Sequence, residues 1–222
     1  MRIIGISGKA QHGKDTLAAA INETLFLSYR LTRRAFADSL KEDAFDILVH
    51  DMRHSGAFDR VWLEEGKEEP IARIDFINRM KSHPVYGPTM RTFLQVYGAT
   101  QREAQADYWI KRLQAWAAMH EEAMGGPRAR TNPPLRFNGL IVPDVRYRNE
   151  AEWIRGQGGL VLRVTRYDEH GQLYQNNLTA EARAHASECD LDDYERFDYH
   201  IENVNGHVID VPALVVDYAC GG

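Results

Sequence analysis

The sequence predicts one α/β domain with a mostly parallel central sheet flanked by helices, and three observations predict it. The length of 222 residues suits one such domain with a large core. Apolar runs typical of buried strands alternate along the chain with segments of helical spacing. The first apolar run ends in a glycine-bounded loop that opens into a helical pattern, and ligands of parallel sheets bind beyond such strand ends.

The first predicted strand and helix flank a candidate phosphate-binding loop. The β-branched run at residues 3–6 predicts a buried strand, and residues 17–27 have the spacing of a helix. Between them, Gly8, Gly13 and Lys14 form the pattern G-x-x-x-x-G-K. The glycines let backbone N–H groups point inward, the helix start adds unpaired donors, and the Lys14 ammonium can reach the outer phosphates of a nucleotide. We therefore predict that this loop binds phosphate groups.

The motif departs from its usual form directly after Lys14. That position normally carries Ser or Thr, whose hydroxyl holds magnesium, whereas here Asp15 follows and the hydroxyl comes one residue later at Thr16. The helix dipole alone also favours an acid in the first turn. A carboxylate beside phosphates would repel them unless a cation lay between, so we expect Asp15 and Thr16 to lie close to a metal ion. Which of the two binds the metal directly stays open.

The remaining elements follow from the same periodicities and from the glycine and proline breaks between them. The first half predicts a strand over 33–37, then a helix that Asp38 or Ser39 caps and that reaches residue 49, and then a loop region with some helix over 53–70. Helical spacing follows over 71–77, with a helix from about Thr89 to Gly98 and a long amphipathic helix over 101–124. The second half predicts a connector over 125–134, strands over 139–142, 159–164 and 199–202, helices over 149–156 and 211–218, and a polar segment over 167–197.

A second candidate site lies at the end of the strand over 139–142, where Asp144, Arg146 and Glu150 follow. An acid there can hold magnesium, directly or through water, and Arg146 can offer a forked donor to phosphoryl oxygens. Glu150, at the start of the next helix, can orient an arginine. The alternative is that Asp144 and Glu150 are a helix cap and a first-turn acid, with Arg146 as their surface partner. The neighbouring phosphate loop favours the functional interpretation.

A third candidate is the pair Arg91 and Gln95, which lie four residues apart and so share one helix face. That face can present a cation to a second phosphate and an amide to a base edge. An exposed polar stripe on a helix with a buried apolar side is at least as compatible with the spacing. Trp109 has the same two interpretations, because an aromatic residue at helical spacing is more often a core residue than a platform for a base.

Composition limits the classes of function. Asp and Glu number 32 against 27 Lys and Arg, which gives a net charge of −5. Proteins that hold long nucleic acids usually present a broad basic face, so the charge favours a small phosphorylated ligand and no nucleic-acid partner. No apolar run approaches the length that crosses a membrane, and two cysteines are too few for a zinc site or a disulfide framework. We expect no membrane partner and a cytoplasmic location.

Six motifs occur in order along nearly the whole chain: G-K-A-Q-H-G-K-D-T, F-A-D-S-L-K, R-T-F-L-Q-V-Y-G, D-Y-W-I, P-D-V-R-Y-R-N-E and H-A-S-E. Together they resemble the deoxynucleoside monophosphate kinases of bacteriophages. The phosphate loop is common to many enzymes, whereas its G-K-D-T ending, joined to R-x-x-x-Q-x-x-G and D-x-R-x-x-x-E, is more specific. One position departs from the family pattern, since Ala99 stands between Gly98 and Thr100 where a threonine usually follows the glycine directly.

The resemblance implies a three-layer P-loop kinase fold in a single domain of residues 1–222, with a nucleotide-monophosphate-binding helical region over about 40–124 and a lid over about 166–198. It implies ATP and Mg²⁺ as cofactors, and a host-cytoplasm location if a phage encodes the chain. The implied ATP- and magnesium-binding residues are Gly8, Lys9, Gly13, Lys14, Asp15 and Thr16, with Asp15 and Thr16 at the metal. The implied deoxynucleotide-binding residues are Asp38, Lys41, Arg91, Gln95, Gly98 and Trp109, and the implied catalytic residues are Lys14, Asp144, Arg146 and Glu150.

The implied reaction moves the γ-phosphoryl group of ATP to a deoxynucleoside 5'-monophosphate. The acceptor oxygen is already ionised at neutral pH, so cations and backbone donors, with no general base, must hold the anionic groups in line. Arg163 and Arg166 are candidates to join this site, and we interpret the polar segment after them as a lid that excludes water. His185 and Glu188 in that segment match the family pattern, and an ordinary charged surface loop is the alternative.

Other functions remain compatible with the sequence. The rivals are a small-molecule kinase of the dephospho-coenzyme A or phosphomevalonate type, a kinase acting on modified bases in phage DNA, and a catalytically silent nucleotide-binding regulator. The sequence leaves open which bases are accepted and whether ribonucleotides are refused. The exposed apolar residues of a long helix are compatible with a homodimer and equally with a monomer.

Overall fold

The computed structural model describes residues 1–25, 29, 31–55, 73–125, 138–176, 178–205, 207 and 209–221. It divides the chain into two compact units, which we describe separately. The sheet unit comprises Met1–Phe36 and Ile110–Gly222. The helical unit comprises Ala37–Trp109.

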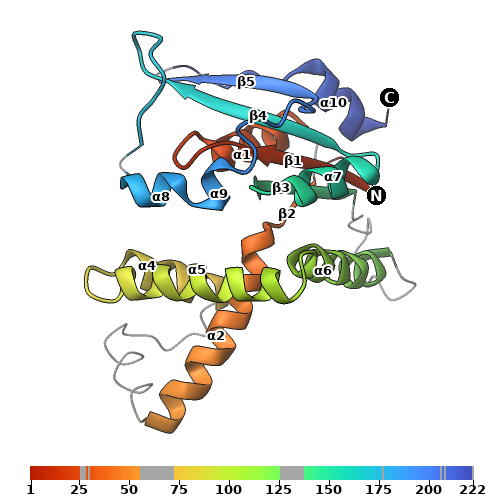
Figure 1. The fold of residues 1–222 in the computed structure, drawn as a ribbon. Helices are drawn as coiled ribbons and strands as arrows, with labels where there is room; N and C mark the ends of the chain where they lie inside the picture. Colours follow the sequence, from red (N-terminus) through yellow and green to blue (C-terminus); the bar gives the residue numbers. More distant parts are fainter. Residues whose placement is uncertain are drawn as a thin grey trace. The chain divides into compact units, whose positions relative to one another are not determined.

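Within the described residues, the sheet unit holds five parallel strands in the order β2-β3-β1-β4-β5 (Figure 1). The strands are β1 (Arg2–Ser7), β2 (Thr32–Arg33), β3 (Gly139–Val145), β4 (Leu160–Tyr167) and β5 (Tyr199–Val204). Ile4 of β1 pairs with Ile141 on one side and with Leu160 on the other. Because β1 lies between two partners and its side chains from Ile3 to Ser7 are buried, the central strand is fixed in register. The predicted parallel sheet is confirmed.

Helices cover both faces of this sheet. The helices of the unit are α1 (Lys14–Thr24), most of α6 (Tyr108–Gly125), α7 (Arg148–Gly156), α8 (Ala180–Ala184), α9 (Ala186–Cys189) and α10 (Ala213–Cys220). Ile4 and Ile6 pack into one core with side chains of α1 and α10. Gly5 points to the opposite face, where an added Cβ would lie 2.5 Å from Ile154 of α7. Alternate residues of β1 therefore contact helices on opposite faces of the sheet.

The helical unit contains α2, α4 and α5. Their bounds are Phe36–Ser55, with Phe36 in the sheet unit, then Arg73–Ser82 and Gly87–Ala104. The unit has its own core, in which Phe76 and Ile77 of α4 pack with Met90 and Leu94 of α5 and Ala44 of α2. These apolar side chains recur at helical spacing, as the sequence predicts for this region.

The second predicted strand is shorter than expected and the helix after it begins earlier. β2 ends at Arg33, and α2 starts at Phe36, before the predicted caps Asp38 and Ser39. The Asp144 carboxylate accepts a hydrogen bond from the Phe36 N–H at 2.8 Å, which satisfies a donor at the helix start from a distant part of the chain. Asp38 consequently lies inside the first turn and is no cap.

The boundary between α5 and α6 also differs from the prediction. α5 begins at Gly87 with Pro88 in its first turn and continues past Gly98 to Ala104, and α6 begins only at Tyr108. Gly98 lies inside the helix, where an added Cβ would touch Leu40 at 3.4 Å. The chain leaves the helix at Gln105, whose backbone is extended. A glycine in a helical pattern was therefore a packing position here, and no helix end.

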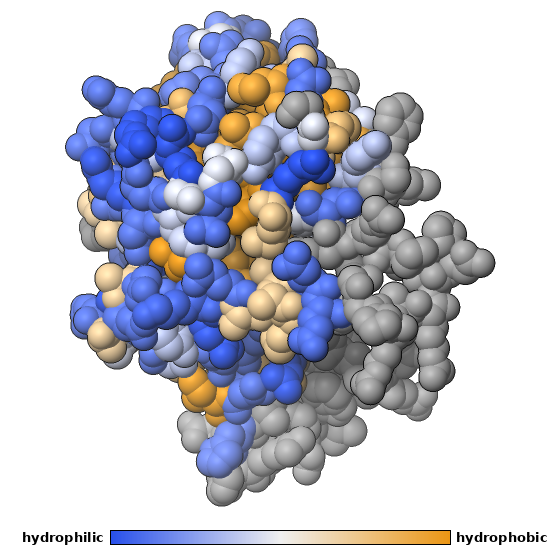
Figure 2. Space-filling view, turned by 90° about the vertical axis from the view of Figure 1, so that its right-hand side faces the viewer, coloured by the Kyte–Doolittle hydropathy of each residue, from blue (hydrophilic) through white to orange (hydrophobic). Residues whose placement is uncertain are grey.

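The other predicted strands and helices of the sheet unit are confirmed, with ends that shift by one to three residues. Most of the predicted loop over 53–70 and of the connector over 125–134 lies outside the described residues, whereas residues 53–55 belong to α2. On the face drawn in Figure 2, hydrophilic side chains cover most of the described surface. No helix of the described part of the chain combines the length and the apolar character that a membrane crossing needs.

Candidate functional site

The loop between β1 and α1 is curled, and its glycines are required by its surroundings. We call residues 8–14 the phosphate loop. Gly13 has a left-handed backbone with φ +93° and forms the N-cap of α1 without a side-chain hydrogen bond. A Cβ at Gly13 would overlap the Asn203 amide, and one at Gly8 would lie 2.7 Å from the Val164 carbonyl oxygen. The loop therefore presents backbone N–H groups at a helix start that no side chain caps.

Lys14 lies inside this loop. Its side chain is buried, with 8% of the residue exposed, and its Nζ donates to the carbonyl oxygens of Gly8 and Lys9, each at 2.8 Å. Burial, followed by the positive charge of Arg146, lowers the pKa of Lys14 to about 8. Both of these hydrogen-bond partners are neutral, and the nearby carboxylates, of which Glu188 acts most strongly, do not outweigh burial and the Arg146 charge, so a phosphate anion would supply counter-charge.

Arg146 reaches the phosphate loop through Glu188. The Arg146 guanidinium forms an ion pair with the Glu188 carboxylate and donates to the Ser187 carbonyl oxygen at 3.1 Å. The other carboxylate oxygen of Glu188 accepts a hydrogen bond from the Ala10 N–H of the loop at 3.0 Å. The structure thus brings the predicted Arg146 to the phosphate loop, and it adds a carboxylate between the two.

Lys9 is held by the same segment as Arg146. Its ammonium contacts the Glu188 carbonyl oxygen and pairs with the Asp192 carboxylate. Asp192 also lies 3.5 Å from Arg163, whose guanidinium donates to the Ser7 hydroxyl at 3.0 Å. The segment around α9 therefore contacts three cations that lie at or beside the phosphate loop.

Asp144 and Glu150 shape the turn that carries Arg146. Glu150 is 2% exposed, and its carboxylate accepts hydrogen bonds from the N–H groups of Arg146 at 2.9 Å and Tyr147 at 3.2 Å. It forms part of the capping box at the start of α7. Asp144 accepts from Phe36, as described above. Both carboxylates thus make helix-start contacts, as the structural alternative predicts, and these contacts set the backbone that presents Arg146.

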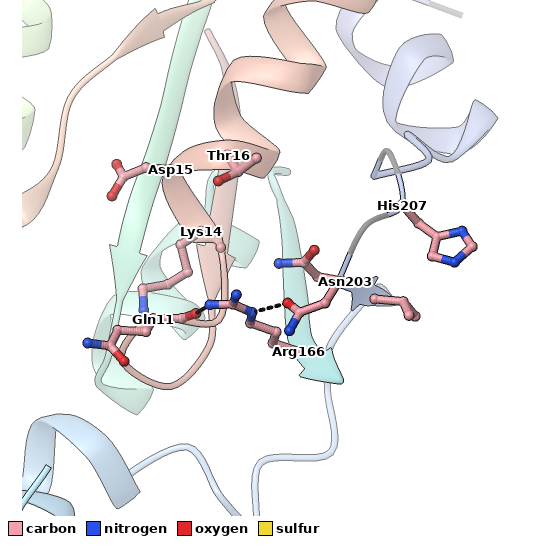
Figure 3. Close-up of a pocket in the computed structure, with 10 residues that line it drawn as sticks. Gln11, Lys14, Asp15, Thr16, Arg166, Asn203 and His207 are labelled. Carbon is pink, nitrogen blue, oxygen red and sulfur yellow. Dashed lines mark hydrogen bonds between the residues drawn. The ribbon is translucent and has the colours of Figure 1, made fainter. Parts of the chain in front are cut away.

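Lys14 also lines a cavity of about 430 Å³ (Figure 3). Arg166 crosses its wall, donating to the Gln11 carbonyl oxygen at 3.1 Å and to the Asn205 side chain at 2.8 Å, and its guanidinium lies 4.1 Å from the centre of the Tyr174 ring. The cavity is lined by Gln11, Gly13, Lys14, Asp15, Thr16, Arg166, Asn203, Val204, Asn205 and His207. The phosphate loop, the end of β4 and the end of β5 therefore meet at one site.

Asp15 and Thr16 both line this cavity, but their side chains project to different sides of the helix start (Figure 3). The exposed Asp15 carboxylate pairs with Arg33 at 2.8 Å. Over the described residues, no group of three or more His, Cys, Asp or Glu side chains is arranged to hold a metal ion. Because the two side chains do not converge on one point, the predicted magnesium site at Asp15 and Thr16 stays a prediction.

Sequence reasoning missed the residues at the end of β5 and directly after it, and the buried His12. Asn203 donates to the His12 carbonyl oxygen at 2.9 Å, and the His12 ring accepts from the Arg166 N–H at 3.2 Å. Burial, together with the Lys14 charge, lowers the pKa of His12. The residues after β5 carry no motif. Their place beyond the carboxyl end of a parallel strand is the one signal that marks them.

The predicted deoxynucleotide-binding residues lie in the helical unit. Arg91 and Gln95 are exposed on α5, and Arg91 donates to the Lys81 carbonyl oxygen at 2.8 Å. Lys41 pairs with the buried Asp38 at 3.4 Å. Trp109 is 2% exposed and its indole N–H donates to the Gly98 carbonyl oxygen at 3.2 Å, so its ring is a core residue in this structure.

The geometry of the sheet unit suits the binding of a phosphorylated ligand. Curled backbone donors, the buried Lys14 and the guanidinium of Arg146 converge at the end of β1. A cavity with amide side chains adjoins them. Comparison with protein-family models and with curated proteins gave no match to this chain.

Proposed function

We propose that this protein is a phosphotransferase that moves the γ-phosphoryl group of ATP to a deoxynucleoside 5'-monophosphate, giving ADP and a deoxynucleoside diphosphate. The observation that carries the proposal is the buried Lys14 ammonium inside a curled glycine loop, with the positive charge of Arg146 beside it. Two cations and a row of amides at a helix start are suited to a chain of phosphates. The bacteriophage-kinase motifs supply the choice of acceptor.

The proposed chemistry needs positioning and charge, with no proton abstraction. Lys14 and the loop amides hold the donor phosphates, and Arg146 stabilises negative charge on the transferred group. Arg163, anchored on Ser7 at the end of β1, adds a further positive charge beside the loop. Asp15 or Thr16 would hold a magnesium ion, which would supply positive charge to offset the negative charge of the phosphates.

The cavity beside Lys14 supports a nucleotide as the donor. Its volume of about 430 Å³ lies within the range of small-molecule sites. Asn203 and Asn205 offer amide donors and acceptors there, and the Arg166 guanidinium presents a flat cationic surface. We propose that the donor phosphates lie on the phosphate loop and that the nucleoside occupies this cavity.

The acceptor site is proposed from the resemblance. Arg91 and Gln95 offer a cation and an amide from one exposed face of α5, and Asp38 and Lys41 form a charged pair in α2. These groups have the chemistry that a nucleoside monophosphate requires.

A substrate panel tests the proposal. The purified protein is mixed with MgATP and each deoxynucleoside monophosphate, and ADP release is measured. We expect turnover with at least one acceptor, a loss of 100-fold or more in Lys14→Met and in Arg146→Ala, and unchanged turnover in Lys111→Met, which alters an exposed lysine of α6. The panel also includes dephospho-coenzyme A, phosphomevalonate and modified DNA as acceptors. Turnover with one of these and with no deoxynucleoside monophosphate would assign the corresponding rival activity. Absence of turnover with every acceptor would refute the kinase proposal.

A further inference from the structure

The side chain of Glu188 places a negative charge directly on the phosphate loop. One carboxylate oxygen accepts from the Ala10 N–H at 3.0 Å, and the other pairs with Arg146. The Glu188 side chain is 9% exposed, so it is buried against the loop. Its negative charge also acts on Lys14, whose pKa it raises against the stronger lowering effects. A carboxylate thus occupies the position of an anionic ligand.

These contacts engage the same groups that a phosphoryl group would need. A backbone N–H of the loop and a guanidinium are the standard donors to phosphate oxygens. Two anions cannot share one N–H at hydrogen-bond distance, because like charges about 4 Å apart repel by several kcal/mol near a protein surface. A phosphate that binds at Ala10 must therefore displace the Glu188 carboxylate.

The segment that carries Glu188 is attached to the phosphate loop by a few polar contacts. α9 is four residues long, and it holds no apolar side chain in the core. Its contacts with the loop are polar: the Glu188 carboxylate accepts from Ala10, and the Glu188 carbonyl oxygen accepts from Lys9. The Ser187 carbonyl oxygen accepts from Arg146 beside the loop. The anchors of this segment lie just beyond α9, at the buried Leu191 and Tyr194. The Glu188 side chain can leave the loop while Leu191 and Tyr194 stay packed.

We propose that Glu188 is an internal competitor of the phosphorylated ligand: it neutralises the phosphate loop in the ligand-free protein and is displaced when a phosphate chain binds. The proposal rests on the proposed function in that the displacing ligand is the phosphate chain of a nucleotide. It assigns to Glu188 a control on affinity, because each binding event must first break the Ala10 and Arg146 contacts.

The test compares Glu188→Gln with the wild type in the binding of inorganic tripolyphosphate, measured by titration calorimetry. The amide keeps the shape of the side chain and removes its charge, and neutral hydrogen bonds are about half as strong as charge-assisted ones. We expect affinity to rise about tenfold. Glu195→Gln, the same change at an exposed position of the same segment, should bind like the wild type. Equal or weaker binding by Glu188→Gln would overturn the proposal, and weaker binding would make Glu188 a positioning residue for Arg146.

Hydrogen exchange in the wild-type protein gives a second readout that needs no variant. On addition of tripolyphosphate, the amides of residues 186–190 should exchange faster while those of the phosphate loop exchange more slowly. Slower exchange in both segments would contradict displacement. The outcome is separable from that of the kinase proposal, because tripolyphosphate has no nucleoside and the readout involves no turnover. Displacement without turnover of any acceptor would leave Glu188 as a competitor and remove the proposed kinase activity.

Discussion

Replacement of Gly13 by alanine tests whether the curled loop is required by the structure. The left-handed backbone at φ +93° costs a non-glycine residue about 1–2 kcal/mol. The new Cβ would overlap the Asn203 amide and break its 2.9 Å hydrogen bond to the His12 carbonyl oxygen, a further loss of about 0.5–1.5 kcal/mol. We expect Gly13→Ala to lower the free energy of unfolding by about 1.5–3.5 kcal/mol in total.

Gly158 offers a matched control. It also has a positive φ, of +72°, but an added Cβ there meets no atom within 4 Å. Gly158→Ala should therefore show the backbone cost alone, about 1–2 kcal/mol. Both variants are compared by thermal unfolding followed by circular dichroism. The extra loss in Gly13→Ala, about 1 kcal/mol, corresponds to a melting temperature about 2–4 °C lower than that of Gly158→Ala.

The binding of tripolyphosphate shows whether Gly13→Ala changes the shape of the loop as well as its stability. Gly13→Ala should also lose affinity for tripolyphosphate, because displacement of Asn203 changes the loop wall, whereas Gly158→Ala should retain it. If Gly13→Ala is as stable as Gly158→Ala and binds tripolyphosphate as tightly as Gly158→Ala does, the loop does not need a residue without a side chain at position 13.

Two further predictions concern charge at the same site. Phosphate binding should raise the pKa of Lys14, which is about 8, so the ammonium should favour binding below that pKa and lose its effect as the pH rises above it. Titrations from pH 6 to 10 compare the wild type with Lys14→Met, which cancels the protonation of tripolyphosphate itself. The ratio of the two affinities should fall above pH 8, and a constant ratio would refute the role of Lys14. Glu150→Gln should lower the free energy of unfolding by about 1–3 kcal/mol, because the neutral amide is a weaker acceptor for the two backbone N–H groups that the buried carboxylate binds. Urea unfolding measures this change, and an unchanged urea concentration at the unfolding midpoint would contradict the role of Glu150.

The position of the phosphate loop could be predicted from the sequence because the motif that marks it is local: a β-branched run, Gly8, Gly13 and Lys14 lie within 14 residues. The atoms that leave no room for a side chain at Gly8 and Gly13 belong to Val164 and Asn203, which are distant in the sequence. The ends of α2 and α5 could not be predicted in this way. Asp144, which binds the N–H at the start of α2, lies 108 residues away, and the packing position of Gly98 beside Leu40 depends on a second helix.

The contact between Glu188 and the phosphate loop could not be predicted from the sequence either, because the two partners are far apart along the chain. Glu188 lies 178 residues from Ala10, in a polar segment without strong periodicity, and its neighbours Cys189 and Asp190 carry no distinguishing signal. The sequence pattern H-A-S-E identified Glu188 as a candidate without a physical role. The contact with the loop supplies one, since it connects the carboxylate to the donors at the end of β1.

Carboxylates at the phosphate loop offset the repulsion among the positively charged side chains that gather there. The chain has a net charge of −5, yet Lys9, Lys14, Arg146 and Arg163 lie close together at the phosphate loop, where like charges repel one another. Glu188 and Asp192 offset that repulsion by pairing with Arg146, Lys9 and Arg163. Ligand binding is then an exchange of one set of anions for another. Affinity is set by how much better a phosphate chain fits the loop than the carboxylate it replaces, which is why the charge of Glu188 should matter more than its size.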